Sequence, residues 1–282
     1  MWGMASLVNG VFDIMLAPFR GMHPAIGLLA ISVATGVIML LIFGKTSNQD
    51  VIRKVKGRLK AHIAEIWLFR NDLAQMLLAV VRVLGNTGVY FVQSLRPLIF
   101  ILVPVVVIMV MLGLRYELRP FQPGETAVLS IRVDDPSWTR GREVRLVGAP
   151  NIEVLSGPLR IPQLCEIDWR IRATAPGVHE ITLVTPAGEV TKSFHVTSGG
   201  HESGSNRAKI AASRGRCFSS AFLLFPSEPP LPASSGVRKI TVRNWPHREL
   251  KLLGWGVHWL IVFFVISMAA GFSVKGLFGV EV

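Results

Sequence analysis

The stretch Leu-Ile-Phe-Ile-Leu-Val-Pro-Val-Val-Val-Ile-Met-Val-Met-Leu-Gly-Leu at positions 98–114 carries no charge and almost nothing polar. A soluble core helix rarely needs seventeen apolar residues in a row, whereas a bilayer core about 30 Å thick needs roughly that many. Residues 25–43 and 252–272 form two further stretches of this kind. The sequence therefore predicts an integral membrane protein with three transmembrane helices, at residues 24–44, 97–114 and 251–273.

Composition predicts a membrane part joined to a water-exposed part, because half of the 282 residues are hydrophobic and 17% are charged. The net charge of +12 is shared by two segments. Residues 45–96 hold nine Lys or Arg against three Asp or Glu, and residues 115–251 hold nineteen against thirteen. The positive charge is therefore spread over a loop and a domain, and a dedicated nucleic-acid-binding protein is not indicated.

The charge distribution also predicts an orientation. A short basic loop beside transmembrane helices usually lies in the cytoplasm, whereas long domains cross the membrane largely regardless of charge. We therefore expect residues 45–96 and the tail at 274–282 in the cytoplasm, and the N-terminus and residues 115–250 outside. The chain has no Asn-x-Ser/Thr sequon, which is compatible with a multi-pass protein of a bacterial inner membrane. The start lacks the basic residues and cleavage site of a secretory signal, so we expect the first transmembrane helix to be retained.

Residues 1–23 carry apolar side chains at helical spacing, interrupted by Asn9, Asp13 and Pro18. This pattern is typical of an amphipathic helix in the membrane interface. An irregular extension of the first transmembrane helix is an equally good interpretation.

Residues 45–96 predict a basic helical hairpin. Steps of three and four residues from Ile52 to Val83 meet apolar side chains at nearly every position, as in a coiled coil. Five basic residues beside this seam are candidates for contact with lipid headgroups, client proteins or ribosomal RNA: Arg53, Lys54, Lys56, Arg58 and Lys60. A single long helix or a plain amphipathic connector would fit the same pattern. Gly85-Asn86-Thr87-Gly88 predicts a turn, after which Pro97 would occupy the first turn of the next helix and Pro104 would kink it.

From Tyr116 onward, the pattern changes to short alternating segments separated by turns that contain Pro and Gly. Such spacing is typical of an antiparallel, immunoglobulin-like β-sandwich, with Trp169 in its core. The predicted strands are 127–133, 143–148, 166–173, 178–184, 189–196, 217–225 and 237–242. The expected fold class is therefore an α+β membrane protein with three transmembrane helices, a cytoplasmic helical hairpin and an external β-sandwich.

Catalytic chemistry is not indicated, because no metal-binding, nucleophile or phosphate-binding motif occurs. We expect a protein without enzymatic activity, cofactor or metal. The two cysteines, Cys165 and Cys217, fall in the segment placed outside, where an oxidising compartment would permit a disulfide. Two free thiols are an equally good interpretation. Within the predicted transmembrane helices, Ser32 and Thr35 are the candidates for a polar groove, and no charged residue is expected there.

The order of parts in residues 1–114 resembles the membrane-protein insertase superfamily, the YidC-type insertases and their shorter three-span relatives. The matching features are Lys45 and Gln49 after the first span, the hairpin at 52–83, the Gly85-Asn86 turn, and Pro97 and Pro104 in the second span. This resemblance implies help with membrane-protein insertion or assembly, with the lipid bilayer and client membrane proteins as partners. Two features depart from the family: the positive charge that such insertases carry in an intramembrane groove is absent, and the β-domain lies between the second and third spans. The alternative is a structural subunit of an envelope complex that binds a partner through its β-sandwich.

Overall fold

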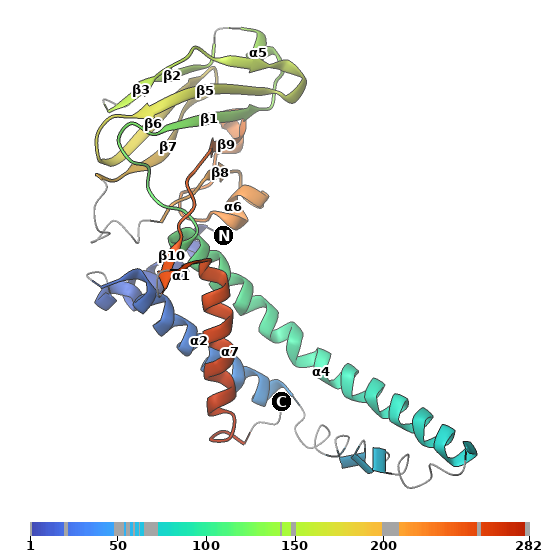
Figure 1. Cartoon of the computed structure of the whole chain (residues 1–282). Coiled ribbons are helices and arrows are strands. Elements are labelled where there is room, and N and C mark those ends of the chain that lie inside the picture. Colours follow the sequence, from blue (N-terminus) through green and yellow to red (C-terminus); the bar gives the residue numbers. More distant parts are fainter. Residues whose placement is uncertain are drawn as a thin grey trace. The chain divides into compact units, whose positions relative to one another are not determined.

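The computed structural model describes residues 2–19, 22–47, 54, 57–58, 60–61, 63–64, 73–141, 143–147, 151–198, 209–252 and 255–279. The chain divides into two compact units, each assembled from segments far apart in the sequence. Residues 1–27 and 109–259 form the first unit, and residues 28–108 and 260–282 form the second. The first unit contains the β-sheets, and the second is built from apolar helices (Figure 1).

Within the described residues, three helices are long and apolar enough to cross a membrane, as expected for a membrane protein. The first is α1 (Trp2–Leu16) with its 3-10 extension η1 (Ala17–Phe19). The second is α2 (Pro24–Thr46), and the third is the part of α4 (Leu73–Tyr116) that begins at Pro97. A fourth apolar helix, α7 (Trp259–Val274), is shorter. Because α1 ends before α2 begins, residues 1–23 are not an extension of the first predicted transmembrane helix.

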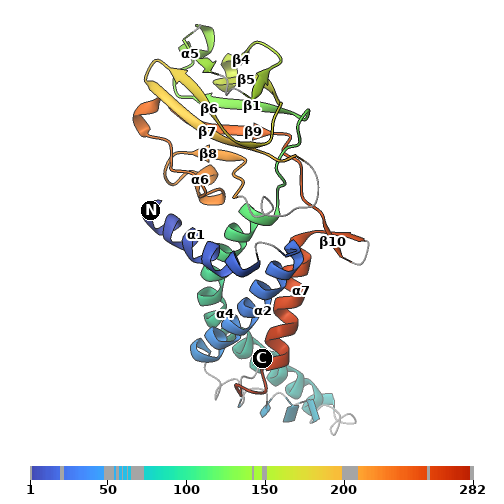
Figure 2. The same ribbon diagram turned by 90° about the vertical axis from the view of Figure 1, so that its left-hand side faces the viewer.

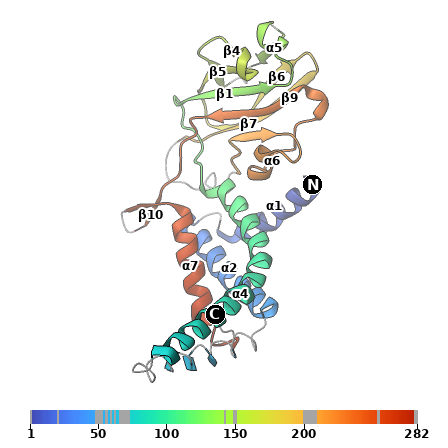
Figure 3. The same ribbon diagram turned by 90° about the vertical axis from the view of Figure 1, so that its right-hand side faces the viewer.

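The predicted helix at 251–273 begins too early. Strands β10 (Leu250–Leu252) and β11 (Trp255–Val257) pair in an antiparallel hairpin, and α7 starts only at Trp259. Figure 3 shows β10 beside the start of α7. Hydropathy depends only on the side chains, so Leu252, Trp255 and Val257 extend the apolar run of the following helix. It does not show that the backbone groups of these residues bond between two strands. The run therefore predicted a longer helix than the one that forms.

The turn predicted at residues 85–88 is wrong, because α4 continues through them as one helix of 44 residues. The Asn86 side chain donates to the Arg82 carbonyl at 2.8 Å, and the Thr87 hydroxyl donates to the Val83 carbonyl at 2.8 Å. These side chains thus bond to the preceding helical turn, which lets turn-forming residues remain helical. Pro97 and Pro104 consequently lie inside α4, and Pro97 does not begin a new helix.

Two antiparallel sheets form the β-domain. The larger contains β1 (Thr126–Val133), β3 (Ile152–Val154), β4 (Leu159–Ile161), β5 (Glu166–Ala173), β8 (Ser213–Gly215) and β9 (Val237–Arg243). The smaller contains β2 (Arg145–Val147), β6 (Gly177–Thr185) and β7 (Gly188–Val196). The larger sheet has the order β3-β5-β1-β9-β8, with β4 also paired to β5, and the smaller has the order β2-β6-β7. Short helices α5 (Ser137–Arg140) and α6 (Ser220–Leu224), and turns η2 (Pro162–Leu164) and η4 (Ala233–Ser235), connect the strands.

Apolar side chains from both sheets form one hydrophobic core, and Trp169 lies within it as predicted. Alternation explains this core: in β1, for example, Leu129 and Ile131 face inward while Arg132 faces out. The rings of Phe121 and Phe194 stack in this core with centroids 4.7 Å apart. Phe121 also forms a parallel bridge with Val196, which ties the segment after α4 to the end of β7.

Six of the predicted strands are confirmed, within a residue or two, by β1, β2, β5, β6, β7 and β9. The strand predicted at 217–225 is wrong, since this segment contains helix α6. The Ser219 hydroxyl accepts a hydrogen bond from the Phe222 backbone at 3.2 Å and thereby caps the helix.

Candidate functional site

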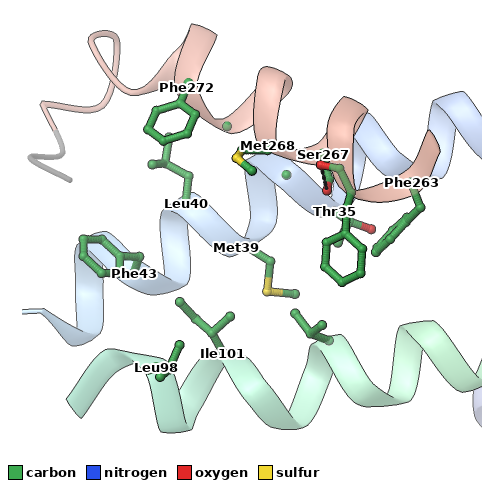
Figure 4. A pocket seen from close by; sticks show the side chains of 14 residues that line it. Thr35, Met39, Leu40, Phe43, Leu98, Ile101, Phe263, Ser267, Met268 and Phe272 are labelled. Carbon is green, nitrogen blue, oxygen red and sulfur yellow. Dashed lines mark hydrogen bonds between the residues drawn. The ribbon is translucent and has the colours of Figure 1, made fainter. Parts of the chain in front are cut away.

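An apolar groove of about 510 Å³ lies between α2, α4 and α7 in the second unit. Figure 4 shows Met39 and Phe43 of α2, Leu98 and Ile101 of α4, and Met268 of α7 around it. The remaining lining residues are Thr35, Gly36, Leu40, Val105, Phe263, Phe264, Ser267, Gly271 and Phe272. Its volume falls in the range of small-molecule pockets, and its two methionines give it adaptable walls.

Helices α2 and α7 are in close backbone contact at two glycines. A Cβ atom on Gly36 would overlap the carbonyl oxygen of Ser267, and a Cβ on Gly271 would lie 3.3 Å from the carbonyl oxygen of Gly36. Small residues permit such approach between membrane helices. The two helices therefore meet at these glycines, which also line the apolar groove.

The two polar candidates within α2 have different positions. The Ser32 side chain is fully buried, and its hydroxyl donates to the Leu28 carbonyl at 2.7 Å, so it satisfies its own helix. Thr35 lines the groove, as does Ser267 of α7, whose hydroxyl donates to the Phe264 carbonyl at 3.1 Å. The structure thus brings Thr35 to the candidate site and leaves Ser32 outside its lining. The groove is apolar, with few polar groups in its walls.

A second cluster, in the first unit, joins α1 to the end of α4. The guanidinium of Arg115 is completely buried and lies 2.7 Å from the carboxylate of Asp13. It also donates to the Met111 carbonyl at 2.8 Å and reaches the backbone and side-chain oxygens of Asn9, both at 3.3 Å. Lys209 binds the other carboxylate oxygen of Asp13 at 2.7 Å. We call Asn9, Asp13, Arg115 and Lys209 the charged junction.

The charged junction lies outside residues 24–44, 97–114 and 251–273, in which no charged residue was expected, but its ion pair, Asp13 with Arg115, lies within two of the helices that are long and apolar enough to cross a membrane. Asp13 lies inside α1 and Arg115 in the last turn of α4. A buried charge is stable only when it is paired and hydrogen-bonded, and here Asp13, Asn9 and a helix carbonyl provide those partners for Arg115. This arrangement fixes α1 to the first unit.

Glu166 is at the centre of a polar cluster on the outer face of the larger sheet. Its carboxylate accepts hydrogen bonds from the Ser130 hydroxyl and from Arg243, and Arg132 lies at 3.4 Å. Burial favours a raised pKa for Glu166, but the Ser130 hydrogen bond and the two arginine charges outweigh it, so the pKa is lowered. These residues, with Lys239 and Thr241, line a pocket of about 110 Å³. Because the cations already bind the carboxylate, we interpret the cluster as a link between β1, β5 and β9.

The free edge of β7 is covered by three groups. Arg214 donates to the Thr191 carbonyl, Lys192 to the Ser193 carbonyl at 3.2 Å, and the Phe121 backbone to the His195 carbonyl at 3.0 Å. The Lys192 ammonium is fully buried and lies 2.6 Å from the carboxylate of Glu228. Burial lowers the pKa of Lys192, and Glu228 opposes that shift. This edge is thus protected against the addition of another strand.

The basic hairpin lies largely outside the described residues, and Arg53 and Lys56 are among those not described. Lys54, Arg58 and Lys60 are helical and exposed. Both cysteines are free thiols: Cys165 is half-buried and Cys217 is exposed. In the part of the chain that the structure describes, no three His, Cys, Asp or Glu side chains are placed to hold a metal ion.

Sequence reasoning missed the charged junction and most of the groove. The junction had a signal, because Asp13 is the only charged residue at positions 1–19 and Arg115 directly follows the apolar run. The groove had none beyond Thr35, since lipid-facing and groove-lining side chains are equally apolar. Comparison of the chain with models of protein families, with curated proteins and with solved structures finds no match.

Proposed function

We propose that the chain is a non-enzymatic membrane protein that assists the insertion or assembly of other membrane proteins. The apolar groove between α2, α4 and α7 carries this proposal. In a bilayer, lipid chains would fill such a groove, and an apolar segment of a client protein would displace them. Met39 and Met268 suit such a role, because flexible thioether side chains adapt to differently shaped apolar partners.

The proposed mechanism differs from that of the insertases that residues 1–114 resemble. Those proteins use a positive charge in a hydrophilic groove, whereas Arg115 is buried in the charged junction and is not among the lining residues here. The groove would therefore hold the apolar part of a client. Client recognition before that step is proposed for the basic segment, where Lys54, Arg58 and Lys60 are exposed. These side chains would contact lipid headgroups, client chains or ribosomal RNA.

The proposal includes a location, which is the bacterial inner membrane. The β-domain, as an immunoglobulin-like sandwich, and the N-terminus would lie outside, and the basic segment and C-terminus would lie in the cytoplasm. Val178 is exposed on the β-domain and provides a test. A cysteine introduced there, in a variant that also carries Cys165→Ala and Cys217→Ser, should react with a membrane-impermeant maleimide added to intact spheroplasts. Reaction only after lysis would place the β-domain in the cytoplasm and reverse the orientation.

A reconstituted insertion assay tests the function. Liposomes with and without the purified protein would receive a single-span reporter made by cell-free translation, and protease protection would measure insertion. Ile101→Trp is the test variant, because Ile101 lines the groove and the larger side chain would fill it. Val103→Trp is the control, because Val103 is on the same helix but is exposed and does not line the groove. We expect the protein to raise insertion, Ile101→Trp to reduce that gain several-fold, and Val103→Trp to retain it. Equal insertion with and without the protein would contradict the proposal.

A structural subunit of an envelope complex is the alternative. Exposed apolar side chains at Leu159 and Leu164 favour it, because a partner could cover them. The covered edge of β7 argues against a partner that adds a strand there. Purification from the native membrane with one fixed set of partners at constant ratio, together with no activity in the insertion assay, would establish this alternative.

A further inference from the structure

Helix α1 has one bonded face and one free face. Its bonded face contains Asn9, Asp13 and the buried Phe12, and packs within the first unit. Its free face carries only apolar or small side chains at helical spacing, and the large exposed ones are Met4, Leu7, Val11, Ile14 and Met15. Since Asp13 is held by Arg115 and Lys209, the free face has no charged residue.

The loop that contains α6 exposes a second group of apolar side chains. Phe218 is 71% exposed, and Leu223 and Leu224 are also exposed. Phe218 has a φ of 64°, a left-handed conformation that residues other than glycine rarely adopt. A strained residue that presents a large ring to its surroundings often marks a functional surface. Exposed apolar groups in such density indicate a partner that is itself apolar.

Helix α1 and the α6 loop, which carry the two apolar groups, are neighbours. The rings of Trp2 in α1 and Phe222 in α6 have centroids 6.4 Å apart, and the Asn9 amide donates to the Pro226 carbonyl at 2.7 Å. Figure 2 shows α1 beside α6, and Figure 3 shows the same arrangement from the opposite side. We call the free face of α1 and the exposed side chains of the α6 loop the apolar platform.

The contacts of α1 with the β-domain also show how the helix runs. Trp2, Asn9 and Asp13 all contact residues of the β-domain, over a helix length of about 16 Å. The helix therefore lies along the domain. Its partners include irregular backbone at residues 209–212 and 225–230, and irregular backbone does not occur where it would face lipid in the hydrocarbon core. A transmembrane position for α1 would require these segments to enter the bilayer as well.

We propose that the apolar platform lies in the headgroup interface of the phospholipid bilayer, with both α1 and the α6 loop inserted shallowly. The partner of the apolar platform is the bilayer, because only residues 20–23 separate η1 from α2. Since α2 is long and apolar enough to cross a membrane, so short a connection keeps α1 close to the membrane surface. Helices with a free apolar face lie roughly 5–10 Å deep in this region. The β-domain is thus docked on the membrane by its own loop. This inference is independent of the groove and of the proposed function.

Cys217 is a native probe for this position, because it is exposed and adjoins Phe218. The full-length Cys165→Ala variant, labelled at Cys217 with a small fluorophore, would be reconstituted in phosphatidylethanolamine–phosphatidylglycerol vesicles. The control carries Cys165→Ala, Cys217→Ser and Val178→Cys, so that its label lies at an exposed site on β6. Quenchers would be aqueous iodide and lipids with a nitroxide near the headgroup or near the bilayer centre.

We expect the Cys217 label to be quenched several-fold more by the shallow nitroxide than by the deep one, and to be shielded from iodide relative to the control. Adding Leu223→Glu, at a position that is 52% exposed, should restore iodide quenching at Cys217. Equal iodide access at both positions would overturn the proposal. So would strongest quenching by the deep nitroxide, which would indicate a transmembrane α1. Shielding from all quenchers would assign the platform to a contact with a second copy of the chain, and would overturn the proposal too.

Discussion

The carboxylate of Asp13 and the guanidinium of Arg115 lie 2.7 Å apart, although 102 residues separate them in the sequence. Asp13 is the one charged residue of α1, and Arg115 directly follows the apolar stretch at residues 98–114 of α4. Their pairing allows α1 to be both apolar and firmly held, since its one charged side chain faces the fold.

Asp13→Asn should destabilise the attachment of α1 strongly. It leaves the fully buried Arg115 without a counter-charge, a change that costs about 3 kcal/mol. Hydrogen–deuterium exchange of residues 2–16 in mild detergent would show faster exchange. Lys209→Gln is the control, because Lys209 is 35% exposed and its loss should cost less than about 1 kcal/mol. Equal acceleration in both variants would contradict the central role of Arg115.

Gly36→Ala should weaken the contact between α2 and α7. The added methyl group would overlap the carbonyl oxygen of Ser267, and overpacking of this kind costs about 2 kcal/mol. Gly88→Ala in α4 is the matched control, because nothing lies within 4 Å of its position and alanine favours helix by about 1 kcal/mol. Thermal unfolding in one detergent should therefore shift down for Gly36→Ala and stay level or rise for Gly88→Ala. A shift in the same direction for both would refute the close contact.

Lys192 and Glu228 should behave as a coupled pair. Replacing either partner leaves a buried charge uncompensated, at a cost of about 3 kcal/mol, so Lys192→Met and Glu228→Gln should each destabilise the β-domain. The double variant should regain much of the loss, and a double-mutant cycle measured by chemical unfolding would give the coupling energy. Additive losses would mean that the two groups do not interact.

The stability of the β-domain should fall in acid. The pKa of Glu166 is below its ordinary value of 4.5 in the folded chain, so the folded state resists protonation while the unfolded state does not. The stabilisation is complete above the unfolded pKa and is lost as pH falls through the lower, folded one. Hydrogen exchange of β1, β5 and β9 between pH 6 and pH 3 should accelerate, and Glu166→Gln should flatten this dependence. A wild-type profile unchanged by Glu166→Gln would show that other carboxylates dominate.

Secondary structure was predictable from the sequence where the spacing of apolar residues matches the hydrogen bonding that the backbone adopts. In β5, Ile167, Trp169 and Ile171 alternate with polar residues, and the strand forms at the predicted positions. Prediction failed where one residue type serves two structures. Asn86 and Thr87 usually favour turns, but here their side chains bond to the preceding turn of their own helix. Trp255 belongs to a β-hairpin, although an apolar residue at this position fits a transmembrane helix equally well.

The candidate site was less predictable, because it depends on contacts between distant segments. Thr35 was identified as the rare polar residue of an apolar helix, but nothing local distinguishes Ile101, which lines the groove, from Val103, which is exposed. Likewise, Arg115 marks the end of a helix in the sequence, and only the fold shows that Asp13 reaches it.

Site-specific photocrosslinking tests the central claim most directly. A photoreactive amino acid at Ile101 or at Val103 of the reconstituted protein would be activated while the single-span reporter is being inserted. We predict adducts with the apolar segment of the reporter from Ile101, and chiefly lipid adducts from Val103. Equal reporter adducts from both positions, or none from Ile101 while insertion proceeds, would contradict a client-binding groove.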